Sequence, residues 1–260
     1  AVACATVVLL AGCSGDAREG RRPDADSASM GGAFADTVRG VVTLRETGGM
    51  TFHRCGSDAQ LWLVEESGAD LSVAARGLAE PGTSLYAELE AESVPAPEAG
   101  PGSEMSGALR VRRWVYLAED TSGCGRLEGR SDESEPEGGG PLPDGVAWRA
   151  QGNEPFWMAD VRAERILVVR PGEDSVAVPP VAPDLDGGTR TWAAETEAHT
   201  LELRVEEEPC IDSMSGFRFS HTARLVLDGT EYGGCARPGP AADGGEGGGG
   251  KGTGSVPPGS

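Results

Sequence analysis

Residues 126–144 divide this chain, because they contain almost nothing that a folded core could bury. The segment is acidic and then glycine-rich, and its large apolar residues are Leu127 and Leu142. A stretch of this composition cannot offset the entropy that is lost on folding, so it is predicted to be a disordered linker. The stretches on either side, residues 38–125 and 145–237, have about 90 residues each, enough for one small domain apiece.

Both stretches carry the alternation of apolar and polar residues that is typical of half-buried β-strands. In the first stretch the alternation occurs at residues 85–91 and 109–117, and residues 69–79 have the apolar spacing of a helix. In the second stretch it occurs at residues 201–205 and 223–227. The sequence therefore predicts a mainly β protein, in which a small barrel with one short helix is followed by a second β-rich domain.

Leu9-Leu10-Ala11-Gly12-Cys13 has the pattern of a bacterial lipobox. The apolar run at residues 1–12 is too short to span a bilayer as a helix, which takes about 20 residues, and fits a truncated signal peptide. We expect a mature chain that begins at Cys13, carries palmitate-type acyl chains there and continues to residue 37 as a flexible tether. Ser14 resembles the outer-membrane sorting pattern of Gram-negative lipoproteins, which predicts a lipid-anchored envelope protein that faces the periplasm.

Four cysteines lie in the two predicted domains: Cys55, Cys124, Cys210 and Cys235. An even number of cysteines in an exported chain predicts disulfide bonds. Four cysteines allow three connectivities, and their order together with the domain boundary favours Cys55–Cys124 and Cys210–Cys235. A zinc site is the alternative, but the cysteines are dispersed and form no C-x-x-C motif.

The net charge of the chain limits its partners. The chain has 22 Lys and Arg residues against 42 Asp and Glu residues, a formal net charge of −20. Nucleic-acid binding requires a basic face, and docking on anionic lipid requires basic clusters, so neither is expected. Contact with a membrane is expected only through the N-terminal lipid. Residues 238–260 are rich in Gly and Pro without an aliphatic pattern, which predicts a disordered tail.

A series of motifs runs through the first domain: Arg39-Gly40, Thr51-Phe52-x-x-Cys55-Gly56, Trp62, Gly82-Thr83-Ser84-Leu85-Tyr86-Ala87-Glu88-Leu89-Glu90, Leu109-Arg110-Val111 and Cys124. In these motifs the domain resembles the C-terminal domain of the NlpE family, outer-membrane lipoproteins of copper homeostasis and surface sensing. The resemblance implies an OB-like barrel closed by a disulfide, which supports the pairing of Cys55 with Cys124. The other half of that family, with its C-x-x-C motif, has no counterpart in this sequence.

Three motifs mark the second domain: Gly152-Asn153-Glu154-Pro155-Phe156-Trp157, Cys210-Ile211-Asp212-Ser213-Met214-Ser215-Gly216 and Gly233-Gly234-Cys235-Ala236. In the patterns G-x-E-P-F-W and C-x-D-x-M-S-G this domain is similar to a family of uncharacterised bacterial envelope lipoproteins and membrane-associated proteins. The resemblance implies an envelope location and carries no established chemistry.

The candidate recognition residues come from these motifs: Glu154, Phe156, Trp157, Asp212 and Met214. Pro155 restricts Glu154 to an extended backbone, so Phe156 and Trp157 should point to opposite faces of a strand. One aromatic ring can then enter the core while the other lies nearer the surface, where aromatic side chains often dominate binding energy. The alternative interpretation is a pure packing role for both rings.

Three groups of residues could bind a metal ion. His53 and Cys55 share a face of a strand and, with Met50, could ligate Cu(I), unless a disulfide occupies Cys55. Met214 and His221 near the later cysteines raise the same alternative. Residues 206–208, three glutamates, could bind a hard cation beside Asp212, but a solvated charge run is the simpler interpretation. We expect neither a metal site nor a cofactor.

The sequence supplies no recognisable catalytic set. Its three histidines, His53, His199 and His221, are scattered over both domains, and their spacing does not predict a catalytic triad. We therefore expect a non-enzymatic envelope lipoprotein that binds or senses an envelope protein or a small ligand. An inhibitor of a hostile envelope hydrolase such as lysozyme is the first alternative, because an acidic protein complements a basic enzyme. Binding of copper or another metal is the second.

Overall fold

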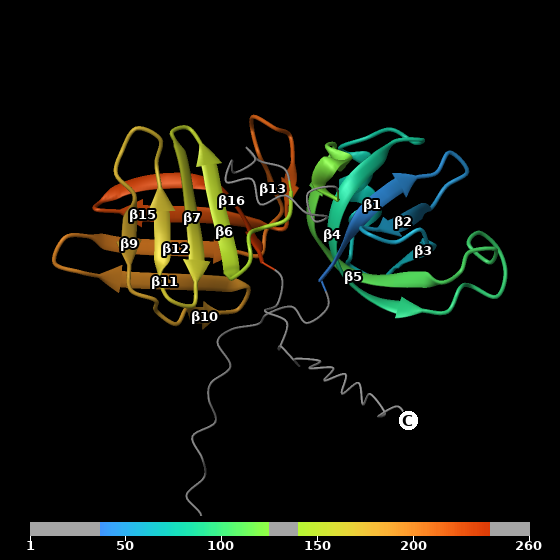
Figure 1. Ribbon diagram of the computed structural model, residues 1–260, viewed down its shortest axis with the longest axis horizontal. Helices are drawn as coiled ribbons and strands as arrows, with labels where there is room; N and C mark the ends of the chain where they lie inside the picture. Colours follow the sequence, from blue (N-terminus) through green and yellow to red (C-terminus); the bar gives the residue numbers. More distant parts are fainter. Residues whose placement is uncertain (1–36, 125–139, 240–260) are drawn as a thin grey trace, which may run out of the picture. The chain divides into compact units, whose positions relative to one another are not determined.

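The computed structural model of this chain describes residues 37–124 and 140–239 (Figure 1). The first range contains the strands β1 (Thr37–Leu44), β2 (Met50–Arg54), β3 (Gln60–Glu65), β4 (Ser84–Val94) and β5 (Ala108–Ala118), the helix α1 (Leu71–Arg76) and the 3₁₀ turn η1 (Thr121–Gly123). The second range contains β6 (Val146–Asn153), β7 (Phe156–Arg162), β8 (Ile166–Val169), β9 (Val176–Val178), β10 (Asp184–Asp186), β11 (Thr189–Glu195), β12 (Thr200–Glu206), β13 (Cys210–Ile211), β14 (Arg218–Phe219), β15 (His221–Leu227) and β16 (Thr230–Pro238).

Several predictions concern residues outside this description. They are the signal peptide, the lipidated Cys13 with its tether, most of the linker and the tail after residue 239. Within the described ranges, no helix has the length and apolar character needed to cross a membrane.

The first half closes into a five-stranded barrel. β1, β2 and β3 form an antiparallel meander, β3 pairs in parallel with β5, and β4 pairs with both β5 and β1. The helix α1 lies between β3 and β4 in the chain, which completes an OB-like topology. Alternate residues of the strands, such as Val42 and Leu44 of β1, fill the barrel core. The predicted barrel with one short helix is confirmed.

The helix α1 is shorter than the apolar spacing of residues 69–79 predicts. It ends at Arg76, because Gly77 follows and glycine is a poor helix former. Leu78 and Ala79 still pack against the barrel core from the segment beyond the helix. The spacing therefore identified the residues that face the core, but it overestimated the length of the helix.

The second half is a curled antiparallel sheet of nine strands in the order β10-β11-β12-β15-β16-β6-β7-β8-β9. Its first and last long strands, β6 and β16, pair with one another in the middle of the sheet. Three tryptophans, Trp148, Trp157 and Trp192, lie in its core. The predicted alternation is confirmed on β12, where Leu201, Leu203 and Val205 are buried, as in the other half-buried strands.

The two halves share a third hydrophobic cluster and a stretch of sheet. The short strand β14 pairs with β5, so that Arg218 faces Leu117 and Phe219 faces Tyr116 in the ladder. Phe219 is buried with Tyr116 and other residues of the barrel in one cluster. No local sequence pattern indicates this contact. The independent folding of the two halves stays a prediction, which this contact makes worth testing.

A buried ion pair also joins the halves. Glu88 of β4 is 2% exposed, and its carboxylate lies 3.2 Å from Nη1 of Arg237 on β16 and 3.6 Å from Nε of Arg39. The hydroxyl of Tyr86 donates a hydrogen bond to the same carboxylate at 3.0 Å. The guanidinium of Arg237 lies over the ring of Tyr116, with its central carbon 3.9 Å from the ring centroid. A buried carboxylate needs such compensation, so the pair depends on both halves.

Candidate functional site

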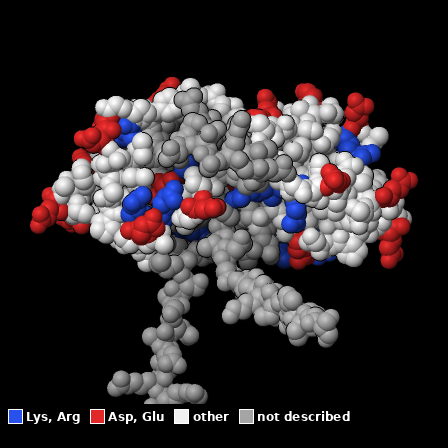
Figure 2. All heavy atoms as spheres, viewed as in Figure 1, with Lys and Arg blue, Asp and Glu red and all other residues white. Residues whose placement is uncertain are grey.

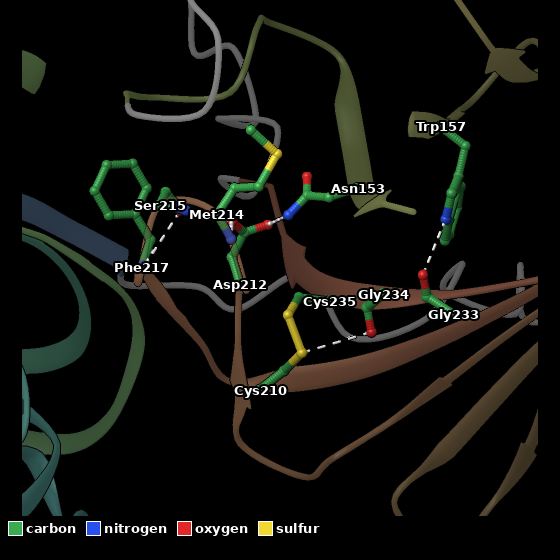
Figure 3. The surroundings of a disulfide bond; sticks show 10 residues. All are labelled: Asn153, Trp157, Cys210, Asp212, Met214, Ser215, Phe217, Gly233, Gly234 and Cys235. Carbon is green, nitrogen blue, oxygen red and sulfur yellow. Dashed lines mark hydrogen bonds between the residues drawn. A yellow bond between two sulfur atoms is a disulfide. The ribbon is translucent and has the colours of Figure 1, made fainter. Parts of the chain in front are cut away.

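Both predicted disulfides are present. Cys55, which follows β2, is bonded to Cys124, which follows η1, and Cys210 of β13 is bonded to Cys235 of β16. The pairing inferred from cysteine order and the domain boundary is therefore confirmed. The second disulfide determines where the next part of the chain lies, because Asp212, Met214 and Ser215 come directly after Cys210 (Figure 3).

The pairing of β16 with β6 completes the site. Cys235 faces Gln151 in this ladder, so the Cys210–Cys235 bond brings the segment after Cys210 to the end of β6. Residues 152–157 and residues 210–216 are thereby neighbours, although they are far apart in the sequence. They border a pocket of about 490 Å³. Its apolar walls are Pro141, Pro143, Trp157, Met158, Val169 and Pro171.

Asp212 orders the loop at the edge of this pocket. Its Oδ1 accepts hydrogen bonds from the backbone N–H groups of Met214 at 3.1 Å and Ser215 at 2.8 Å, and from the Ser215 hydroxyl at 2.8 Å. Its Oδ2 accepts a hydrogen bond from Nδ2 of Asn153 at 2.8 Å. Burial alone would raise the pKa of Asp212, but these hydrogen bonds outweigh it and keep the pKa below its ordinary value. Asp212 is therefore a charged positioning residue for the loop.

Phe156 and Trp157 point to opposite faces of β7, as the sequence predicted. Trp157 is 3% exposed, and its indole N–H donates a hydrogen bond to the carbonyl of Gly233 at 3.1 Å. Gly152 permits this packing, because a Cβ at that position would lie 2.4 Å from the indole nitrogen. Phe156 is 49% exposed and lines the pocket from its edge. The burial pattern thus gives Trp157 a wall position and leaves Phe156 open to a partner.

Met214 is the second large apolar side chain at the edge of the pocket. It is 66% exposed, although the hydrogen bonds of Asp212 fix its backbone. Ile211, on the same hairpin, is also exposed. Exposed apolar side chains that gather at the edge of a pocket, as Phe156 and Met214 do, are typical of binding surfaces. Glu154, the remaining candidate recognition residue, is exposed between Asn153 and Phe156, in the turn that joins β6 to β7.

The polar groups of the pocket differ in whether they are already occupied. Arg149 makes a bidentate pair with Asp160, at 2.7 and 2.8 Å. The side-chain amide of Gln151 makes no hydrogen bond with the described residues, and Oδ1 of Asn153 points away from Asp212 and is likewise unused (Figure 3). Sequence reasoning missed Gln151 and the proline walls, because their position depends on the distant strand pairing and on no local pattern.

The metal alternatives do not gain support from the geometry. Cys55 is in a disulfide, Met50 is buried in the barrel core, and Nε2 of His53 is hydrogen-bonded to the carbonyl of Ser57. In residues 206–208 the carboxylates of Glu206 and Glu207 pair with Arg204 and Arg113. Within the two described ranges, no three His, Cys, Asp or Glu side chains are grouped in a way that could hold a metal ion.

Comparison of this chain with protein-family models, with curated proteins and with solved structures found no match. The resemblance of the first half to the NlpE family therefore stays a prediction, as does the similarity of the second half to uncharacterised envelope proteins.

Proposed function

We propose that this chain is a lipid-anchored protein of the bacterial cell envelope that acts by binding a ligand or partner protein, and that the pocket between β6, β7 and the Asp212 loop is its binding site. The observation that carries the proposal is the convergence of two distant motifs on one pocket. The G-x-E-P-F-W motif supplies Phe156 and Trp157, and the C-x-D-x-M-S-G motif supplies Asp212 and Met214.

The rigidity of the site supports a binding function. A disulfide, a strand pairing and four hydrogen bonds to Asp212 fix the loop before any ligand arrives. Fixing a loop in advance removes part of the entropy cost of binding. Binding sites are usually apolar concavities of about 300–1,000 Å³ with a few well-placed polar groups, and this pocket matches that description.

The anchor at Cys13 would place this site near a membrane surface, in the periplasm if the Ser14 sorting pattern operates. A protein on a short tether stays close to the membrane surface, so its partner would be another component of the envelope. This location agrees with a role in sensing or capture of envelope proteins or small ligands.

Site-specific photo-crosslinking in the bacterium that produces the protein would test the proposal. A photoreactive amino acid at position 156 should give a discrete adduct that is lost when Met214→Ser is added. The matched control carries the same group at position 185, because Leu185 is also a large exposed apolar residue but does not line the pocket. Equal adducts from both positions, or none from position 156, would refute a binding function for this pocket.

A further inference from the structure

The walls of the pocket indicate what kind of group enters it. Proline, methionine, tryptophan and valine side chains are among those that line it, and Phe156 and Met214 are exposed at the edge. Such surfaces bind apolar side chains, because both sides lose water-exposed area on contact. The volume of about 490 Å³ leaves room for more than a single methyl or isopropyl group.

The unused polar groups favour a peptide over a lipid chain. The amide of Gln151 and Oδ1 of Asn153 face the same pocket without a partner among the described residues. An acyl chain would bury both groups without a hydrogen bond, which is unfavourable. A peptide offers a backbone N–H or C=O beside each apolar side chain, so it can fill the apolar volume and satisfy both amides.

The charged residues around the pocket indicate which charge the ligand carries. The two arginines at the pocket are occupied, Arg149 by Asp160 and Arg237 by Glu88 and the carbonyl of Gly140. Two carboxylates beside the pocket, by contrast, are not occupied. Asp144 and Glu154 follow the lining residues Pro143 and Asn153, are exposed, and have no ion-pair partner among the described residues. Asp and Glu side chains are also spread over the face seen in Figure 2, in line with the net charge of −20. A basic ligand is attracted to such a surface, and an acidic one is repelled.

From these three observations we propose that the pocket recognises a basic peptide segment of an exported protein, with one apolar side chain inserted between Phe156, Met158 and Met214. This inference rests on the proposed function, because it assigns a ligand class to the same site. The inserted side chain provides affinity, and flanking Lys or Arg residues near Glu154 and Asp144 provide selectivity.

Selection from a displayed library of random peptides would test the ligand class. The full chain with Cys13→Ser is immobilised at low salt, and the bound peptides are sequenced. The expected consensus is an apolar residue flanked by Lys or Arg. A consensus that lacks basic residues would overturn the inference, and so would the absence of any consensus.

Variants of the same chain then test the two parts of the recognition separately. Phe156→Ser should weaken the selected peptides about thirtyfold, the effect of losing an aromatic hot spot. Glu154→Lys should weaken them at least about fivefold at low salt and less at high salt. The controls Leu185→Ser and Glu197→Lys make the same changes at exposed residues that neither line the pocket nor lie next to a lining residue in the sequence, and should have no effect. Equal losses in a variant and its control would contradict the site.

Palmitate is the probe for the competing ligand class. The peptide inference would be overturned by three results together: palmitate binds with one-to-one stoichiometry, Phe156→Ser abolishes that binding, and the peptide selection yields no consensus. The proposed function would survive that outcome, because the pocket would still be a binding site. The proposed function fails if crosslinking from position 156 gives no adduct, or gives the same adducts as position 185, so the two failures are distinguishable.

Discussion

His221 should make this protein lose stability in mildly acidic solution, well above the pH at which carboxylates titrate. Its side chain is 0% exposed, its Nδ1 lies 2.7 Å from the Ser220 hydroxyl, and its ring meets the ring of Trp148 edge to face at 4.9 Å between centroids. Burial, together with the positive charges of Arg113 and Arg190, lowers the pKa of His221 to about 3.

The sign and size of the effect follow from this shift. In the unfolded chain the histidine has a pKa of about 6.5. Below that pH the unfolded state therefore binds a proton at this histidine, while the folded state keeps the imidazole neutral. The stabilisation is therefore present above pH 6.5 and is lost as the pH falls toward 3. For these two pKa values, the free energy of unfolding should fall by about 2 kcal/mol between pH 8 and pH 5. The loss should reach about 4 kcal/mol at pH 3 and level off near about 5 kcal/mol at lower pH. Small domains have about 5–15 kcal/mol in total, so the change is easily measured.

Urea unfolding followed by tryptophan fluorescence, at both pH values, would measure this change. His221→Gln removes the titration while keeping a polar side chain of similar size, so its free energy of unfolding should change by less than about 0.5 kcal/mol between the two pH values. His53→Gln is the matched control, because His53 is exposed and its imidazole is not buried on folding. If His221→Gln retains the full loss, the reasoning is refuted. If that variant does not fold, NMR titration of the His221 imidazole in the unchanged protein tests the same reasoning. The imidazole resonances should remain those of the neutral form at pH 5, and resonances of the protonated form at that pH would refute it.

Three further predictions concern other parts of the chain. Cys13→Ser should abolish palmitate labelling and leave an unprocessed or soluble protein, and labelling that persists would exclude the anchor. Limited proteolysis should cut first within residues 126–144, and the two oxidised fragments should each remain folded; fragments that unfold under oxidising conditions would show that the halves depend on their shared cluster. Arg237→Met should destabilise the protein by about 3–5 kcal/mol in urea titrations, because Glu88 loses a buried partner. Adding Glu88→Gln should recover part of that loss, and no recovery would mean that Arg237 acts through packing alone.

The strands were the most predictable part of the structure, because their signal is local. Alternation with a period of two depends only on residues a few positions apart, and it identified β4, β5, β12 and β15 from their side chains alone. The helix α1 was located correctly but its end was not, because apolar spacing continues through Gly77 to Leu78. In both cases the apolar pattern predicted which residues face a core. It was a poorer guide to the backbone conformation of those residues.

The candidate site was predictable only in part, because two links are needed to assemble it. The first link, the Cys210–Cys235 bond, could be inferred from the order of the cysteines. The second, the alignment of Cys235 with Gln151 on β6, is a long-range strand register that no local pattern reveals. Without it, the motifs at residues 152–157 and 210–216 have no known spatial relation. This is why Phe156 and Met214 could be named as candidates from the sequence, while the pocket that they border could not.

The placement of the arginines connects the fold to the proposed ligand. Arg113 lies 2.7 Å from the carboxylate of Glu90 in its own half and also pairs with Glu207 of the other half, while Arg237 reaches Glu88 across the same contact. Each of these arginines is neutralised by the glutamates that it pairs with, so these ion pairs add little to the field of the outer surface. The field of the outer surface is therefore set by exposed carboxylates without an ion-pair partner among the described residues, such as Glu154 and Asp144, and in our proposal this field attracts basic partners over distances of about 10 Å. If the arginines that join the halves were replaced by neutral residues, the contact would weaken while the outer carboxylates kept their field. Selection of a basic ligand should accordingly depend on Glu154 and its neighbours and remain independent of the charges between the halves.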